Sequence, residues 1–273
     1  MNKRIESAQA KIVRAMKQRH SLENCLAEYR SREPYRKIVH ADGKMTLEII
    51  EPPPIEISVI AGEVIYQLRS ALDHIFFALI RQHYPDGNIP ADIRNTCQFP
   101  LCSRPPGDSS NRPPIPRASF KNVPGCIPAD AFTIIECLQP YNRKHHGHDL
   151  LDMLRTFYNI DKHRHLNTTV TWIDRRHTIH GKNGLVSTVI VPMLKDGAEL
   201  YEPTHFAEVD KDAIEVKDEY VVKVAFDEPE YGPPQTTPIE DVIYDLPTWV
   251  FRISTLFNKF FAPATLEMST IPG

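Results

Sequence analysis

Residues 55–84 constrain the fold more than any other segment, because their helical periodicity predicts two faces that both need cover. One face is a continuous apolar stripe of the kind that packs into a core: Ile57, Ile60, Ala61, Val64, Ile65, Leu68, Leu72, Ile75, Phe76 and Leu79. The opposite face should be polar and solvated, yet it carries Tyr66, Arg69, Ser70, Asp73, His74 and Phe77. This mixture predicts a second, partly covered surface, where pKa values shift and chemistry becomes feasible. The alternative is an ordinary Arg69–Asp73 ion pair on a solvated face.

Four further helices are predicted, and together with residues 55–84 they favour a helical bundle. Their ranges are 4–31, 128–138, 147–160 and 239–262. The last one has a wide apolar face, which predicts that it packs on the other helices. Residues 85–128 are rich in proline and weakly periodic, so we expect an ordered loop there, anchored by Phe99, Leu101 and Phe120.

Strand patterns occur in two places along the chain. Residues 36–50 predict a hairpin, because Asp42-Gly43 stands between two β-prone runs. The period also changes from helix to strand at about residue 166, with the clearest strands at 168–173, 185–191 and 219–226. We therefore predict one α+β domain over 1–273. Its helical bundle comprises 1–165 and 236–262, with a hairpin after the first helix and an antiparallel β insertion at 166–235 before the last.

Composition indicates a soluble chain with an uneven distribution of charge. No apolar run approaches the length of a membrane span, the N-terminus lacks a signal-peptide pattern, and the five cysteines are an odd set, so we expect reduced thiols in the cytoplasm. Residues 1–37 carry ten Lys and Arg against four acids, whereas residues 199–245 carry three Lys against fourteen acids. This split suits a polyanionic partner on one surface, a dimer, or two solvated faces of opposite sign.

A second polar cluster follows the helix predicted at 147–160. Asp161, His163 and His165 alternate there, and a metal ion bound together with His74 or Asp73 is one reading. A polar helix C-terminus is another, since His and Lys complement the helix dipole, and a metal-free polar site with the helix at 55–84 is the third. We read His145–His148 as a loop, and we expect neither a metal nor a cofactor.

Two resemblances arise at these residues. The segments Leu68-Arg-Ser-Ala-Leu-Asp-His74 and Asn159-Ile-Asp-Lys-His-Arg164 resemble those of an uncharacterised bacterial family, which implies no function. The spacing Arg69-x-x-x-x-His74 also resembles the RxxxxH motif of HEPN domains. That resemblance implies a dimeric helical bundle and metal-independent RNA cleavage, as in defence or toxin systems. In it, Arg69 holds the scissile phosphate and His74 transfers protons. Ser70 departs from the Asn, Asp or His that active members more often carry there.

Three functional hypotheses follow. The first is a HEPN-like endoribonuclease that acts on RNA as a homodimer, with catalytic Arg69 and His74 supported by Ser70, Asp73, Asp161, His163 and Arg164. The second is a non-catalytic binding or structural protein, in which Arg69, Asp73, Asp161, His163 and Arg164 form a buried ion-pair network between two helices. The third is a metal-dependent hydrolase that uses His74, Asp161, His163 and His165.

Overall fold

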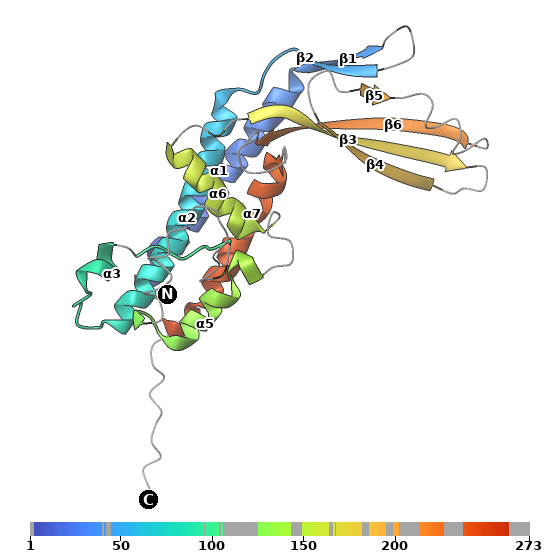
Figure 1. Cartoon of the computed structure of the whole chain (residues 1–273). Helices are drawn as coiled ribbons and strands as arrows, with labels where there is room; N and C mark the ends of the chain where they lie inside the picture. The colour runs from blue at the N-terminus through green and yellow to red at the C-terminus, as the bar shows by residue number, and fades with distance from the viewer. Residues whose placement is uncertain are drawn as a thin grey trace, which may run out of the picture. The chain divides into compact units, whose positions relative to one another are not determined.

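The computed structural model describes residues 3–39, 41, 45–95, 97–103, 105, 125–142, 149–163, 166, 168–181, 186–194, 199–201, 213–226 and 237–261. Over these residues the chain is α+β: helices form a bundle, a β-hairpin follows the first helix, and antiparallel strands precede the last (Figure 1). The predicted fold class is therefore confirmed. The predicted turn at Asp42-Gly43 lies outside the described residues.

The helices begin and end close to their predicted positions. They are α1 Lys3–Ser31, α2 Ile55–His83, α3 Ala91–Asn95, α5 Ala129–Cys137, α6 Leu150–His163 and α7 Ile239–Leu256, with short 3-10 turns at Pro140–Asn142 and Asn258–Phe260. The short helix α3 was not predicted, because five residues are too few to show a period. The helix expected to reach residue 262 ends at Leu256, where the chain tightens into the second 3-10 turn.

The chain folds into two compact units, and α1, α2 and α7 each contribute residues to both. The first unit comprises Met1–Met16, Ile65–Tyr158 and Leu246–Gly273, and the second comprises Lys17–Val64 and Asn159–Asp245. On either side of the β insertion the units are divided at residues 158/159 and 245/246, whereas the sequence predicts that the insertion is divided from the helical bundle at 165/166 and 235/236. The second unit combines the described strands with parts of α1, α2 and α7 and with the last turn of α6. That 1–273 is a single domain stays a prediction.

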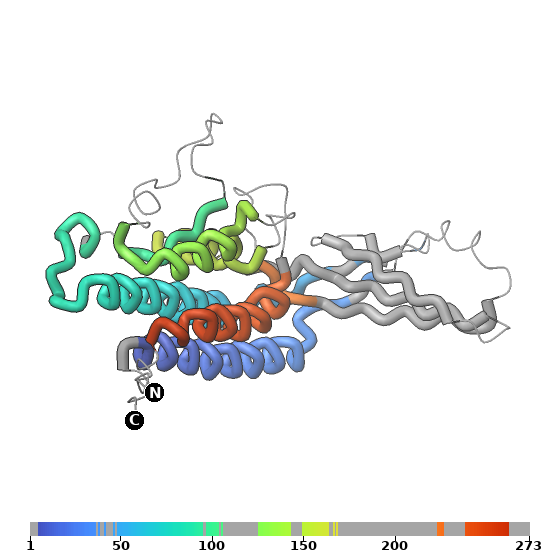
Figure 2. Tube along the Cα trace, turned by 90° about the horizontal axis from the view of Figure 1, so that it is seen from below, coloured from blue at the N-terminus to red at the C-terminus, as the bar shows by residue number. Residues whose placement is uncertain are grey.

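The first unit is helical, with α1 beside α2 and α2 beside α6 (Figure 2). Its core takes one apolar stripe from each helix: Ile5, Ala8, Ile12 and Ala15 of α1, Ile65, Leu68, Leu72, Ile75 and Leu79 of α2, Ala131 and Ile135 of α5, Leu151 and Leu154 of α6, and Leu246, Val250 and Ile253 of α7. The part of the stripe predicted for residues 55–84 that lies in this unit, from Ile65 to Leu79, is therefore buried as expected.

The second unit holds two antiparallel sheets. Strands β1 Tyr35–Val39 and β2 Met45–Ile49 form the predicted hairpin, and β5 Glu199–Tyr201 pairs with β2. The other sheet has the order β4-β3-β6-β7, with β3 Thr168–Gly181 between β4 Val186–Leu194 and β6 Ala213–Phe226 (Figure 1). Strand β7 is the two-residue segment Thr237–Pro238, which leads directly into α7.

The first turn of α7 is held by ion pairs in the second unit. Glu240 pairs with Arg30 of α1, and the Nζ atom of Lys223 on β6 lies 3.2 Å from Oδ1 of Asp241. Acidic side chains at a helix N-terminus are favoured by the helix dipole. These contacts fix α7 to α1 and β6 at the point where the strands end.

Candidate functional site

Arg69, Asp73 and the backbone of Phe99 form a closed polar ring in the first unit. Arg69 Nη2 donates to the Phe99 carbonyl at 2.8 Å and lies 3.2 Å from Oδ1 of Asp73. The same Oδ1 accepts the Phe99 N–H at 2.8 Å. Two side chains one helical turn apart on α2 thus satisfy both polar groups of one backbone residue, as a neighbouring strand would.

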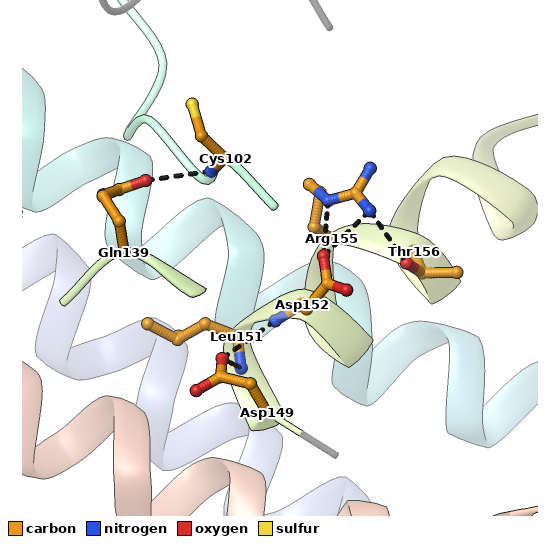
Figure 3. A network of polar contacts seen from close by, with 7 residues as sticks. All are labelled: Cys102, Gln139, Asp149, Leu151, Asp152, Arg155 and Thr156. Atoms are coloured by element: carbon orange, nitrogen blue, oxygen red, sulfur yellow. Dashed lines mark hydrogen bonds and ion pairs between the residues drawn. The ribbon is translucent and has the colours of Figure 1, made fainter. Parts of the chain in front are cut away.

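The segment around Phe99, residues 97–103, is held from a second side by Gln139. This side chain is fully buried, and its amide donates to the carbonyls of Pro100 and Ile135, both at 2.9 Å. Its oxygen accepts the N–H of Cys102 at 2.9 Å (Figure 3). We call residues 97–103 the Phe99 strap. Its backbone is hydrogen-bonded by Arg69 and Asp73 of α2 on one side and by Gln139, just after α5, on the other.

The Phe99 ring anchors the strap in the core. The ring is fully buried, and it meets the rings of Phe76 and Phe257 edge-to-face, each at a centroid distance of 6.3 Å. Edge-to-face pairs add about 0.5–1.5 kcal/mol each beyond the area they bury. Phe99 therefore joins α2 to the end of α7 through apolar contacts as well as through its backbone.

A row of alternating cations and aromatic rings crosses three helices beside the polar ring. The Arg69 guanidinium lies 5.9 Å from the centre of the Tyr158 ring, and Tyr158 of α6 stacks on Tyr66 of α2 at 6.3 Å. Lys11 of α1 then lies 5.5 Å from the centre of the Tyr66 ring. Arg69 is buried, whereas Tyr66 is 49% exposed. The row therefore runs from the buried Arg69 to the exposed Tyr66. The other residues of this face are half-buried: Ser70, Asp73, His74 and Phe77.

Burial dominates the electrostatics of the acid in this site. Burial raises the pKa of Asp73, while Arg69, the Phe99 N–H and His74 act in the opposite direction. Burial likewise raises the pKa of Tyr158, with a further contribution from Asp73. Asp73 is therefore a desolvated carboxyl whose charged form depends on Arg69 and the strap.

His74 faces a different neighbour from that of Arg69. Its Nδ1 atom lies 3.0 Å from Oγ of Ser7 on α1, in a partly exposed position. Ser70, which follows Arg69 in the sequence, is half-buried. Five residues separate Arg69 from His74, which rotates their side chains by about 140° around the helix. Arg69 accordingly contacts the strap and α6, while His74 contacts α1.

The start of α6 carries a polar network of its own (Figure 3). Oδ1 of Asp149 accepts the backbone N–H groups of Leu151 and Asp152 at 2.9 and 3.2 Å, which is the bonding of an N-cap residue. One turn on, Arg155 Nε donates to Asp152 Oδ1 at 2.9 Å. Asp149 therefore caps α6, which begins at Leu150 rather than at the predicted residue 147.

The second polar cluster of the sequence falls in the other unit. Asp161 lies on the last turn of α6 with its carboxylate against Gly62 of α2, and His163 is exposed at the end of α6. Arg164 and His165 lie outside the described residues. Among the residues the structure describes, no group of three or more His, Cys, Asp and Glu side chains gathers as a metal site would require.

Sequence reasoning missed the partners that complete the site. It singled out Arg69 and Asp73 but not the Phe99 backbone, Tyr158 or Gln139. A backbone partner leaves no pattern in side-chain identity. For Gln139 the only available signal was an amide between two predicted helices.

Comparison with known proteins gives no relative for this chain: no family model, curated protein or solved structure matches it. Separately, none of the helices within the described ranges combines the length and apolarity that crossing a bilayer demands.

Proposed function

We propose that this chain is a non-catalytic binding or structural protein, in which Arg69 and Asp73 serve the architecture of the helical unit. The observation that carries the proposal is the closed ring of Arg69, Asp73 and the Phe99 backbone. An arginine that binds a substrate phosphate must present its donors to solvent. The Arg69 side chain is 8% exposed, and its Nη2 donor is already committed to a carbonyl and a carboxylate.

The rest of the cluster supports the same proposal. Tyr158 covers the guanidinium on one side, and the strap that Arg69 holds is bonded independently by Gln139. Removing Arg69 from these contacts leaves a buried acid and a buried carbonyl without their partner, at a cost of about 3 kcal/mol or more. If Arg69 had to leave these contacts to bind a substrate phosphate, each catalytic cycle would incur that free-energy cost.

One observation favours HEPN-like, metal-independent cleavage of RNA as a second candidate. His74 is partly exposed and its contact is a serine hydroxyl rather than an acid. Histidine is the side chain most often used for general acid–base catalysis, and here it is within reach of solvent. The nuclease then needs a cation other than Arg69 for the phosphate, or an opened strap.

An RNA-cleavage assay separates the two candidates. Wild type, His74→Ala and Arg69→Lys are incubated with structured and single-stranded RNA, with and without EDTA, and unfolding is followed in parallel. We expect no cleavage above buffer from any of them, and a lower free energy of unfolding for Arg69→Lys, because an ammonium cannot bridge Phe99 and Asp73. The control is Arg155→Lys, which alters a more exposed ion pair on α6.

The opposite result is as clear. Cleavage by wild type in EDTA, lost about 100-fold or more in a folded His74→Ala, overturns the proposal and supports the nuclease. Loss of cleavage in EDTA that returns with a divalent metal supports the hydrolase instead.

A further inference from the structure

Helix α7 has a second face that its own core stripe does not use. Its inner face is buried through Val242, Ile243, Leu246, Val250, Ile253 and Phe257. On the opposite side, Tyr244, Thr248, Phe251 and Thr255 are all exposed, with Tyr244 at 61% and Phe251 at 46%. Their spacing of four, three and four residues is that of a seam between two packed helices. We call these four residues the outer stripe.

The charges beside the outer stripe are self-complementary. The Arg19 guanidinium of α1 lies 5.0 Å from the centre of the Tyr244 ring, and Tyr244 stays 61% exposed beside it. Asp245 and Arg252 are both exposed, lie seven residues apart and follow Tyr244 and Phe251 directly. Both therefore lie along the same edge of the stripe. When two copies of such a helix pack antiparallel about a two-fold axis, the equivalent edges face each other. Asp245 of one copy then meets Arg252 of the other, and the contact occurs twice.

The stripe itself fits the same arrangement. In this register Thr248 faces Phe251 of the second copy, and Tyr244 faces Thr255, so each aromatic ring packs against a small β-branched side chain. A large residue opposite a small one lets two helices approach closely. An isologous contact of this kind needs one self-complementary surface, which the outer stripe and its charged edge supply.

We propose that a second copy of this chain docks antiparallel on the outer stripe of α7, with reciprocal Asp245–Arg252 pairs. The proposal is independent of the α2 cluster and of the proposed function. A single helix pair buries little area compared with a standard interface, so the association is concentration-dependent.

Analytical ultracentrifugation over a range of protein concentrations tests the proposal. We expect the wild-type mass to rise from 31.2 kDa toward twice that value. Phe251→Asp should weaken the association at least tenfold, because it places a charge at the centre of the stripe. Val59→Asp is the matched control, since Val59 of α2 is 44% exposed and lies outside the stripe, and it should leave the association unchanged.

Charge exchange gives the decisive comparison. Asp245→Arg and Arg252→Asp should each weaken the dimer, since each single variant places two like charges opposite each other. The double variant restores opposite charges at both contacts and should recover dimerisation. Three outcomes each overturn the proposal. The first is wild type that stays monomeric at the highest concentration measured. The second is an equal effect of Phe251→Asp and Val59→Asp, and the third is a double variant that dimerises no better than the single ones.

Discussion

Asp73 illustrates how a single residue is shared between two structural tasks. Its Oδ1 atom accepts the Phe99 N–H and faces the Arg69 guanidinium, so it orders the strap and balances a buried cation. A buried ion pair contributes little net stability, yet removing one partner lowers the stability strongly because the other charge stays buried without a counter-charge. This asymmetry makes the residue a sensitive test of the site.

Asp73→Ala should lower the free energy of unfolding by about 3–5 kcal/mol, because it leaves Arg69 buried without its acid. The measurement is a urea titration followed by circular dichroism. Glu23→Ala is the control: Glu23 pairs with Arg19 at the same i,i+4 spacing but with far more exposure, so its loss should cost about half a kcal/mol. A comparably small cost at Asp73 would show that the ring contributes little.

The stability contributed by Asp73 should depend on pH in a direction set by burial. Because burial raises its pKa in the folded protein above the ordinary value of 3.8, the folded state binds more protons than the unfolded state above that pH. The contribution is therefore fully present below pH 3.8 and is lost as pH rises through the folded pKa. Urea titrations at several pH values should show wild type losing stability relative to Asp73→Asn on that rise. A relative gain would mean that Arg69 outweighs burial.

At the scale of elements, the contact between α2 and α6 in the second unit depends on the absence of a side chain. A Cβ atom at Gly62 would lie 2.8 Å from Cγ and 3.0 Å from Oδ2 of Asp161, closer than atoms of these types approach. Glycine is otherwise unfavourable inside a helix by about 1 kcal/mol relative to alanine. The Asp161 carboxylate occupies the space that a Cβ atom would need, which is the physical reason for a glycine at this position.

Gly62→Ala should therefore destabilise by about 1–3 kcal/mol, despite its better helix propensity. In the Asp161→Ala background the obstacle is gone, and the same substitution should be neutral or stabilising by up to about 1 kcal/mol. Thermal unfolding of the four proteins in this cycle gives the coupling between the two positions. Additive effects would contradict the close contact.

At the scale of the molecule, the three long helices α1, α2 and α7 each supply residues to both compact units. A helix propagates order along its length, since each added residue forms a bond on a turn that already exists. Shared helices therefore favour cooperative unfolding of the whole chain. The prediction of a single domain can therefore be tested by asking whether the two units unfold together.

The two tryptophans provide that test, because Trp172 lies in β3 of the second unit and Trp249 in α7 within the first. We expect Trp172→Phe and Trp249→Phe, each leaving one fluorescent reporter, to give coincident urea midpoints that match far-ultraviolet circular dichroism. Circular dichroism of both variants against wild type controls for the substitutions themselves. Separate midpoints for the two reporters would show that the units unfold independently and that the chain is not one domain.

What the sequence determined by itself is the set of local patterns. The buried stripe from Ile57 to Leu79 depends on neighbours within a few residues, so helical periodicity predicts it. The approximate starts of α2 and α6, predicted at residues 55 and 147, follow from the same kind of local pattern. The same rules identified Arg69 and Asp73 as an unusual pair.

The tertiary structure decided what that pair does. The Phe99 backbone is 30 residues from Arg69 along the chain, and Gln139 is 37 from Cys102. The packing of the Phe99 ring against Phe76 of α2 and Phe257 at the end of α7 holds this segment beside Arg69. Every residue has the same backbone carbonyl, so residue identity does not predict which carbonyl a buried guanidinium will bind. The role of Arg69 therefore follows from the folded chain rather than from the residues beside it.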